Sequence, residues 1–473
     1  MIAHYLPGLA TEYFILEWLI RLAMLFVVPF RRTPQAAQAW LLTIFFLPVP
    51  GVILYAAIGR PRFPAWRTAR MRSLAPFFAE VSSELDAPRG DAEAGLEQSP
   101  VATLGRRLGS LPATGGNHVE FLDDYDGTID RLVADIDTAR RHVRILVYIF
   151  ADDAPGLKLI EALGRASARG VACHVMIDAL GSRQWAKRVL KRLRDAGVTA
   201  RQALPLRLLR GRTRGDMRNH RKLFLIDGAI GYAGSQNIVD KNFKPGIVNH
   251  ELVVRMTGPA VAEMEAIFLG DWYVESETML DRVETSFAGD GTTVAQLLPS
   301  GADYPLEGFE TLLVWQIHQA RRRVVITTPY LIPDEGLIGA MRTAVARGVE
   351  IDLIVSKVVD QRLVSLAQRS YFQALLEAGI RIHQYRDLLL HAKNVSIDGA
   401  LGIVGSSNVD LRSFQLNEEV SLLLLDTESV ARLEAIQHGY IDASDLLDLK
   451  AWRARPRRLR IVESLARLVS PLL

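Results

Sequence analysis

Residues 220–237 read HRKLFLIDGAIGYAGSQN, and residues 391–408 read HAKNVSIDGALGIVGSSN. Both stretches share one skeleton: His, one residue, Lys, four residues, Asp, six residues, Gly-Ser, one residue and Asn. In the first copy, the apolar run after the Lys predicts a strand, the Asp-Gly pair predicts a turn, and a second short strand follows. This repeat decides the fold, because each copy has to belong to an equivalent structural unit.

The repetition extends beyond the two motifs. Three further pairs of stretches match in the same order and at nearly the same displacement: 139–153 with 320–334, 167–177 with 345–355, and 195–202 with 377–384. The first copy alternates expected strands with expected helices, at 117–123 (strand), 126–140 (helix), 142–150 (strand), 156–170 (helix) and 171–178 (strand). We therefore expect a duplicated α/β domain whose parallel-type sheet is covered by helices, and the 473-residue length suits two domains.

The repeated motif gathers polar side chains that suit a phosphate. His220 and Lys222 are two residues apart, so they project from the same face of a strand, and Ser235 and Asn237 do so on the next strand. The second copy supplies the matching set His391, Lys393, Ser406 and Asn408. Lys, Ser and Asn donate hydrogen bonds to phosphate oxygens, whose charge grows during nucleophilic attack. The pattern therefore predicts a phosphodiester site.

Two copies of the motif suit an in-line displacement, which needs a group on each face of the phosphorus. One imidazole can attack to give a phosphohistidine, while the other protonates the leaving alcohol and then activates the incoming one. A carboxylate is needed to orient each imidazole. We expect Glu251, which follows His220, and Glu419, at a similar spacing after His391, to have this role, since each opens an apolar strand.

The N-terminal segment, residues 1–60, contains two apolar runs. Residues 39–58 are long enough to span a bilayer, and two prolines and a glycine near their middle predict a kink or a re-entrant shape. Residues 13–30 are a second candidate span; they carry two charged residues, so an interfacial helix or an edge helix of the core is the alternative. Five arginines follow the second run and two lie between the runs, which predicts that the rest of the chain is cytoplasmic.

The remaining boundaries follow from composition and from the repeat. Residues 61–116 are expected to be a basic juxtamembrane stretch and a linker, and the sequence DAPRGDAEAGLEQSP at 86–100 is typical of a flexible one. The two repeated domains are then 117–285 and 286–450. Residues 451–473 are expected to form a basic amphipathic helix, which lies on an anionic leaflet or packs on the catalytic domain.

Charge and cysteine content narrow the class of partner. Residues 183–222 hold fourteen Lys or Arg and two acidic residues, although the net charge of the chain is only +3. Such a segment is either a solvated helix face with a flexible basic loop or a surface that meets phosphates in lipid or nucleic acid. The apolar N-terminus favours anionic membrane lipid, and no nucleic acid is expected. The single cysteine, Cys173, excludes an intramolecular disulfide, and no zinc-ligand spacing or other cofactor signature is found.

These motifs resemble a known family. The repeated skeleton is similar to the HKD motif of the phospholipase D superfamily, and the wider sequence resembles the bacterial cardiolipin synthases. The stretches that carry the likeness are AWLLTIFFLPVPGVILYAAIGRPR, YIFADD, RNHRKLFLIDG, TPYLIPDE, QRSYFQALLEAG, GSSNVDLRSFQLNEEV and ARLVSPLL. The resemblance implies two tandem phospholipase D-type domains, each a mixed sheet flanked by helices and related by a pseudo-twofold axis, preceded by transmembrane helices. It implies a metal-free condensation of two phosphatidylglycerol molecules into cardiolipin and glycerol at the bacterial inner membrane.

Carried over by position, the HKD residues are His220, Lys222, Asp227, His391, Lys393 and Asp398. The superfamily usually uses the N-terminal histidine as nucleophile, which implies that His220 attacks and that His391 is the acid and base. The residues themselves do not distinguish the two copies. Asp227 and Asp398 fall at strand ends, which also suits a structural role. The Arg-rich insert at 207–218 departs from the family; it suits either binding of anionic headgroups or a disordered loop.

Three other functions compete with cardiolipin synthesis. A phospholipase D that passes the same intermediate to water would share the first half of the reaction. A nuclease would explain the basic insert, but it would leave the two apolar runs without a use. A non-catalytic lipid-binding scaffold is disfavoured, because no motif position is lost in either copy.

Overall fold

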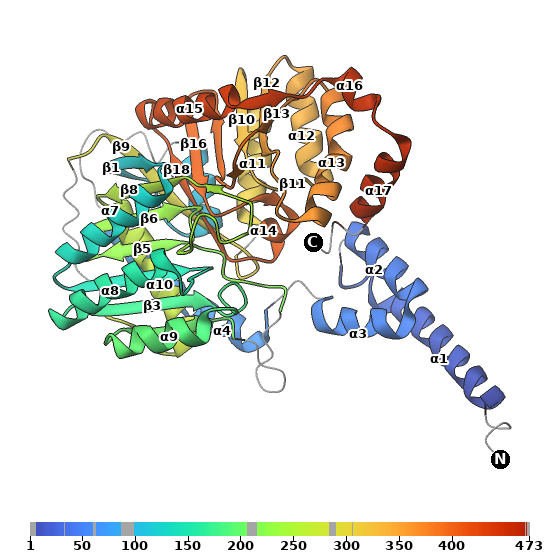
Figure 1. Ribbon diagram of the computed structural model, residues 1–473, viewed down its shortest axis with the longest axis horizontal. Helices are drawn as coiled ribbons and strands as arrows, with labels where there is room; N and C mark the ends of the chain where they lie inside the picture. Colours follow the sequence, from blue (N-terminus) through green and yellow to red (C-terminus); the bar gives the residue numbers. More distant parts are fainter. Residues whose placement is uncertain are drawn as a thin grey trace.

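The computed structural model describes residues 6–32, 34–59, 63–86, 99–205, 215–282, 290–304, 306–468 and 470. Within these residues, the chain forms a body around a fifteen-stranded sheet, from which three N-terminal helices extend (Figure 1). Most of the Arg-rich insert lies outside the described residues, so its two interpretations stay open.

Each half of the chain contributes a similar set of strands to the sheet. The first half gives β1 (Thr114–Leu122), β2 (His142–Val147), β3 (Ala172–Asp178), β4 (Thr199–Ala203), β5 (Leu223–Ile226), β6 (Ile230–Gly234) and β8 (Val253–Thr257). The second half gives β9 (Thr293–Ser300), β10 (Arg323–Thr327), β12 (Glu350–Ser356), β13 (Arg381–Tyr385), β15 (Asn394–Ile397), β16 (Leu401–Gly405), β18 (Glu419–Leu424) and β19 (Ser444–Leu446).

The strand order repeats outward from the centre of the sheet. The order β1-β8-β6-β5-β2-β3-β4 is matched by β9-β18-β16-β15-β10-β12-β13, with β19 added at the second edge. At the centre β1 and β9 pair antiparallel, as a pseudo-twofold relation between the halves requires. Within this fifteen-stranded sheet, pairing is parallel only among β2, β3 and β4 and among β10, β12 and β13. The mixed sheet is thus confirmed, while the parallel-type sheet expected from strand–helix alternation holds only for these outer strands.

Helices cover both faces of the sheet. One face carries α7 (Tyr125–Thr138), α8 (Ala154–Ala168) and α9 (Ala186–Asp195) in the first half, and α11 (Gly308–Gln319), α12 (Glu335–Ala346) and α13 (Arg362–Glu377) in the second. The other face carries α10 (Ala260–Ser276) and α15 (Thr427–Asp442). Because side chains alternate along a strand, Ile145 of β2 packs with α8 while Leu146 packs with α10, which is why the strand reads as a continuous apolar run.

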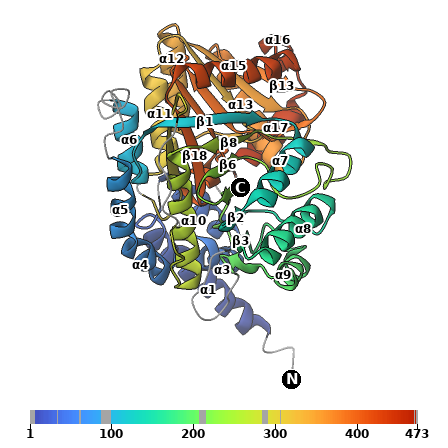
Figure 2. The same ribbon diagram turned by 90° about the vertical axis from the view of Figure 1, so that its left-hand side faces the viewer.

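The expected linker is largely helical where it is described. It contains α4 (Ala65–Ser73), α5 (Ala75–Leu85) and α6 (Pro100–Gly109), which lie along one flank of the body (Figure 2). The prediction of a linker was wrong for these helices, because Phe78, Val81 and Leu85 form an apolar stripe on α5 that joins the core beside α10. Residues 87–98, the centre of the predicted flexible stretch, lie outside the described residues.

The N-terminal apolar runs form α1 (Leu6–Val27), α2 (Pro34–Phe46) and α3 (Pro48–Ile58). The predicted kink in residues 39–58 is a complete break at Leu47, because Pro48 lacks the N–H that a continuing helix requires. The prediction of two membrane-crossing helices is not confirmed: among the described residues, none of the helices combines the length and the apolar character needed to span a bilayer.

The C-terminal segment forms α16 (Leu449–Arg453) and α17 (Arg457–Leu468). Helix α17 packs against α13 through buried Glu463, which accepts a hydrogen bond from Arg369 Nε at 2.9 Å. Its apolar positions Leu459, Val462, Leu465 and Leu468 remain exposed. Helix α17 therefore packs on the body, which is one of the two expected arrangements, and its apolar face remains exposed.

Candidate active site

Two short strand contacts join the halves at the repeated motifs. β7 (Asn249–His250) pairs in parallel with β14 (Leu389–Leu390), and the backbone N–H of His391 donates to the carbonyl of His250 at 2.8 Å. On the other side, a bridge links Asn219 to Glu418, and the N–H of His220 donates to the carbonyl of Glu418 at 2.8 Å. Each contact sets a histidine of one half beside a glutamate of the other.

The two catalytic candidates are therefore crossed His–Glu pairs. His220 Nδ1 lies 3.0 Å from both carboxylate oxygens of Glu419, and His391 Nδ1 lies 2.8 and 3.0 Å from those of Glu251. Both glutamates are buried. An ionised carboxylate only accepts hydrogen bonds, so Nδ1 carries the proton, and Nε2 of a neutral ring is left with a free lone pair. Glu251 and Glu419 thus contact the imidazoles as expected, each across the boundary between halves.

The side chain of each motif lysine turns back to the backbone carbonyl of the histidine in the same motif. Lys222 Nζ donates to the carbonyl of His220 at 2.6 Å, and Lys393 Nζ donates to the carbonyl of His391. Both lysines are buried. The residues precede strands β5 and β15 rather than standing within them, so the predicted strand position is wrong by a few residues. Two cations are thus held beside the imidazoles, where they favour an anionic ligand.

The motif serines support the glutamates instead of lining the cavity described below. Ser406 Oγ donates to Glu419 Oε2 at 2.5 Å and accepts from the N–H of Val420 at 3.0 Å. Ser235 Oγ accepts from the N–H of Leu252 at 3.0 Å and donates to the carbonyl of the same residue at 3.2 Å, next to Glu251. Sequence reasoning assigned both serines to the substrate, but the backbone turns them toward the carboxylates.

The motif asparagines do line that cavity. Asn237 Oδ1 accepts from the N–H of Ile149 at 3.0 Å, which leaves its amide NH₂ group as a donor. Asn408 lies at the equivalent place of the second half, and its buried Oδ1 has no hydrogen-bond partner among the residues that the structure describes. Both side chains are placed to meet a polar ligand.

The motif aspartates hold turns and do not line the cavity. Asp227 accepts from the backbone N–H groups of Arg140, Arg141 and His142 at 2.8, 2.8 and 2.9 Å. Asp398 accepts from three successive N–H groups at 2.7, 2.8 and 2.9 Å, and both aspartates have a positive φ, +54° and +56°. Their place in the catalytic set is corrected: each ties the turn after its motif strand to the start of β2 or β10.

Replacing Asp398 by alanine is expected to cost stability rather than rate. Three charge-assisted hydrogen bonds are lost and alanine disfavours the left-handed backbone, so the free energy of unfolding should fall by about 2–4 kcal/mol. Asp398→Asn keeps an acceptor and tolerates this backbone, so it should lose only about 1 kcal/mol. Urea unfolding followed by circular dichroism measures both; a stable Asp398→Ala protein without activity would contradict the turn role.

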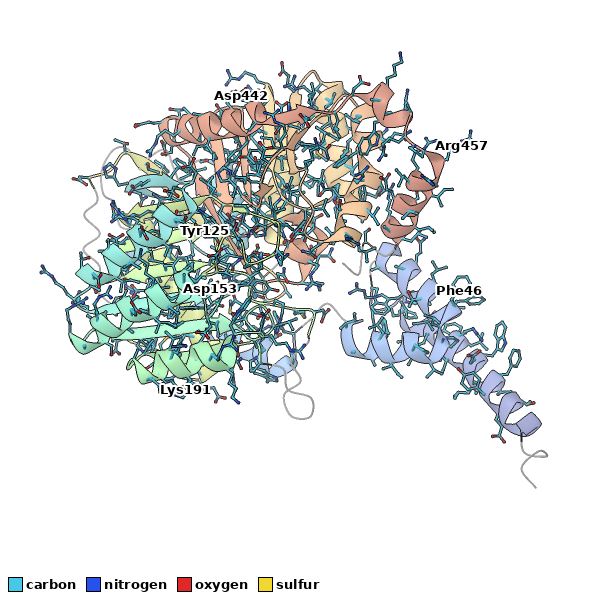
Figure 3. The ribbon with its side chains drawn as sticks, viewed as in Figure 1. Phe46, Tyr125, Asp153, Lys191, Asp442 and Arg457 are labelled. Atoms are coloured by element: carbon cyan, nitrogen blue, oxygen red, sulfur yellow. The ribbon has the colours of Figure 1, made fainter. Side chains whose placement is uncertain are left out.

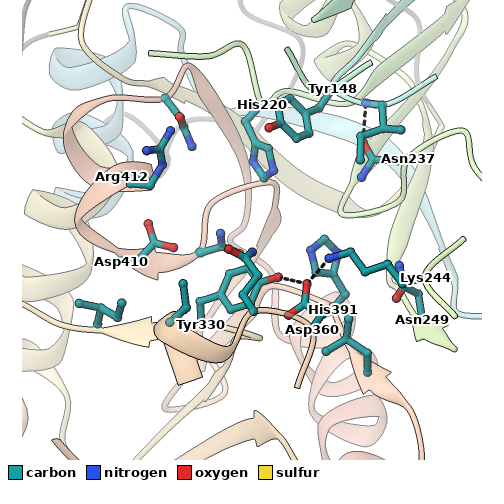
Figure 4. Close-up of a pocket in the computed structure, with 18 of the residues that line it drawn as sticks. Tyr148, His220, Asn237, Lys244, Asn249, Tyr330, Asp360, His391, Asp410 and Arg412 are labelled. Atoms are coloured by element: carbon teal, nitrogen blue, oxygen red, sulfur yellow. Dashed lines mark hydrogen bonds and ion pairs between the residues drawn. The ribbon is translucent and has the colours of Figure 1, made fainter. Parts of the chain in front are cut away.

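A cavity of about 460 Å³ opens between the halves and contains both histidines. Figure 4 shows the His220 and His391 rings on opposite sides of this space. Tyr148 packs edge-on against His220, with ring centroids 4.8 Å apart, and Tyr330 lies on the His391 side. Further lining residues include Asn237, Lys244, Asp360, Asn408, Asp410 and Arg412. A tetrahedral phosphorus between the two rings can thus be approached from both sides.

The surroundings of the site lower the pKa values of both histidines and both lysines, which favours neutral imidazoles and makes the lysines weaker bases than usual. Burial lowers the pKa of His220 to about 4, in spite of its glutamate, and lowers the pKa of His391 as well. Burial also lowers the pKa of Lys222 to about 7 and that of Lys393 to about 8. Burial alone would raise the pKa of Glu251 and Glu419, but the histidine and lysine beside each bring it below the usual value. Both carboxylates therefore stay ionised.

These values predict a bell-shaped pH profile of kcat/KM. Activity requires a neutral His220, whose cationic form appears as pH falls through about 4, and a protonated His391 together with cationic lysines, whose charge is lost as pH rises through about 7 to 8. Because burial also lowers the pKa of His391, we expect a maximum near pH 5–6 and a fall above it, measured with phosphatidylglycerol in non-ionic detergent. A plateau that continued past pH 10 would show that the lysine charges are not needed.

Several lining residues were missed from the sequence. Tyr148 and Tyr330 lie in the repeated stretches 139–153 and 320–334, so the repeat carried a signal for them. Lys244 and Asp360 belong to no repeated motif, and nothing in the sequence marks them. Within the described part of the chain, no cluster of His, Cys, Asp or Glu side chains is arranged to hold a metal ion.

Comparison with known proteins agrees with this geometry. Residues 132–272 and 313–439 match the family model "Cardiolipin synthase, PLD-like domain", and residues 19–60 match "Phospholipase_D-nuclease N-terminal". Cardiolipin synthase A of Serratia proteamaculans (strain 568) is 34% identical over 486 residues, and that of Erwinia tasmaniensis is 34% identical over 488; each alignment covers 98% of this chain and 100% of the relative. The phosphatidylserine synthase structure of Haemophilus influenzae Rd KW20 has a TM-score of 0.60 at 16% identity, over 79% of this chain and 100% of its own, and supports the fold alone.

The duplicated sheet, the paired motifs and these matches define an enzyme of the phospholipase D superfamily. Within that superfamily, the chain belongs to the cardiolipin synthase family.

Proposed function

We propose that the chain condenses two phosphatidylglycerol molecules into cardiolipin and glycerol through a covalent phosphohistidine. The observation that carries this proposal is the pair of imidazoles that face one cavity, each hydrogen-bonded to a glutamate of the other half. A single motif would provide only one face of a displacement at phosphorus.

In the first step, Nε2 of His220 attacks the phosphorus of one phosphatidylglycerol. The N–P bond forms, the bond from phosphorus to the glycerol headgroup oxygen breaks, and protonated His391 gives its proton to that oxygen. The low pKa of His220 supports its role as a neutral nucleophile, and Glu419 stabilises the positive ring. An anionic phosphodiester in the cavity favours the imidazolium that His391 needs to be.

In the second step, the headgroup of another phosphatidylglycerol takes the place that glycerol left. His391 accepts the proton of its hydroxyl, the new O–P bond forms, and the N–P bond to His220 breaks. The amides of Asn237 and Asn408, which line the cavity, supply donors for the phosphoryl oxygens, and the buried Lys222 and Lys393 behind the two histidines supply positive charge. Both imidazoles end the cycle as they began it.

The test is a product analysis of the purified full chain with phosphatidylglycerol in detergent and a chelator present. Cardiolipin and glycerol in equal amounts are the expected products by mass spectrometry. If phosphatidic acid were the sole lipid product, the reaction would be hydrolysis rather than transfer. If the chelator abolished activity, the metal-free mechanism would be overturned.

We further propose that α1–α3 seat the enzyme in the bacterial inner membrane, with the sheet body on the cytoplasmic side. The support is apolar exposure: aromatic and aliphatic side chains stand outward along α1 and α2, and Phe46, 72% exposed, extends away from the body (Figure 3). Soluble proteins rarely expose a continuous apolar surface of this kind, and such surfaces mark contacts with a membrane or with another protein. Exposed Arg72 of α4 follows in the chain and would meet anionic headgroups, whereas Arg67 of the same helix is buried in ion pairs with Glu275 and Asp303.

The membrane proposal is tested by flotation with phosphatidylglycerol vesicles. A Trp18→Ser, Phe26→Ser, Phe46→Ser variant should float far less than the unchanged chain, because three exposed aromatic side chains no longer enter the lipid. Gln38→Ser, at an exposed polar position of α2, is the control and should float normally. Equal flotation of the triple variant would show that this surface is not the membrane contact.

A further inference from the structure

The two sides of the cavity are not equivalent. The side chain of Asp360 is only 4% exposed beside His391, and its Oδ2 accepts hydrogen bonds from Lys244 Nζ and from the Tyr330 hydroxyl, both at 2.6 Å (Figure 4). Among the described residues, no donor bonds to Asp360 Oδ1. The carboxylate therefore lines the cavity with one oxygen fixed by two donors and the other available to a ligand.

The cluster of Asp360, Lys244 and Tyr330 departs from the pseudo-twofold relation of the halves. The loop after β12 brings Asp360 and Gln361 to the cavity, whereas the corresponding loop after β3 brings Leu180 and Gly181. A carboxylate thus stands on the His391 side, where the other half offers an aliphatic side chain and a glycine. The reaction has the same asymmetry, since an alcohol must sit on one side of the phosphorus only.

We propose that Asp360, Tyr330 and Lys244 form a subsite for the glycerol headgroup of phosphatidylglycerol. The proposal rests on the proposed function, in which His391 protonates the leaving oxygen, so the departing glycerol lies beside His391. Because the second step reverses the geometry of the first, the accepting glycerol headgroup occupies the same place. Asp360 Oδ1 accepts a hydrogen bond from a glycerol hydroxyl that does not react, while Tyr330 and Lys244 hold the carboxylate in position.

The charges of the cluster favour a neutral polyol. Burial would raise the pKa of Asp360, but the hydrogen bonds from Lys244 and Tyr330 keep it below the usual value, so the group is a carboxylate. Lys244 neutralises that charge, and an ammonium headgroup such as that of ethanolamine would meet a lysine already in place. A hydroxyl group needs no counter-charge. The subsite thus selects glycerol over ethanolamine, and an ordered alcohol over water.

The experiment is headgroup exchange by the full chain in mixed micelles of phosphatidylglycerol and detergent. Deuterated glycerol is varied, and its incorporation into phosphatidylglycerol is measured by mass spectrometry together with phosphatidic acid from hydrolysis. Asp360→Asn should raise the glycerol concentration for half-maximal exchange by about 10-fold or more, since a hydrogen bond to a charged group is weakened. It should also raise the ratio of phosphatidic acid to exchanged lipid. Lys244→Met should raise ethanolamine incorporation relative to glycerol several-fold.

The control is Asp445→Asn, which alters an exposed aspartate paired with Lys357 and should change neither ratio. If Asp360→Asn does not fold, Tyr330→Phe carries the test, because it removes only the hydroxyl that fixes the carboxylate and should weaken glycerol use in the same direction. Half-maximal glycerol within twofold of the unchanged chain in the folded variant would overturn the subsite. An unchanged chain that makes neither cardiolipin nor exchanged lipid would instead overturn the proposed function.

Discussion

His220→Ala and His391→Ala are each expected to lower cardiolipin formation by about 10⁴-fold or more, because each removes a group that the displacement cannot replace. Loss of His220 removes the nucleophile, and loss of His391 leaves the glycerol oxygen without a proton donor. The rate of cardiolipin formation from phosphatidylglycerol in detergent measures both. His318→Ala, on the exposed face of α11, is the control and should retain full activity. Full activity in either of the first two variants would refute the paired site.

Glu251→Gln and Glu419→Gln should each lower the rate by about 10²- to 10⁴-fold, because an amide cannot stabilise the imidazolium or fix its tautomer as a carboxylate does. The crossed contacts make a sharper prediction. Glu251 serves His391, so the defect of Glu251→Gln should shrink with a phosphatidyl donor whose leaving group is 4-nitrophenol, which departs without a proton. Glu419 serves His220, so the defect of Glu419→Gln should persist.

Glu428→Gln, at an exposed position of α15, controls for the loss of a carboxylate at the surface. If each glutamate served the histidine of its own half, the two responses to the better leaving group would be exchanged. The comparison therefore tests the crossed arrangement and not only the importance of the glutamates.

The duplicated architecture could be predicted because a repeat is a property of the sequence itself. The mirrored strand order follows from two copies of one unit joined at β1 and β9. The crossed pairs could not be predicted, since they depend on two-residue contacts such as β7 with β14, which are too short to leave a pattern. The similar spacing from each histidine pointed to the glutamates that contact the imidazoles, but it did not show which histidine each glutamate contacts.

The predictions that were wrong or missing concern features that local sequence patterns do not determine. The hydroxyls of Ser235 and Ser406 would suit a phosphate equally well. Only the direction of the backbone decides that Ser406 donates to Glu419 and that Ser235 donates to the carbonyl of Leu252. Helix α5 was missed because the acidic, Ala-rich stretch around it hides the spacing of Phe78, Val81 and Leu85. Chemistry that is spread over single residues from separate loops, as at Asp360, leaves no local signal.

The proposed mechanism rests most on His220 as the residue that carries the phosphatidyl group. The direct measurement is alkaline quenching of the full chain during turnover, digestion at high pH to preserve the N–P bond, and peptide mass spectrometry. The mass of a phosphatidyl group on a peptide that contains His220, absent in His220→Ala, is the predicted result. The same adduct on His391, or turnover without an adduct on either histidine, would contradict it.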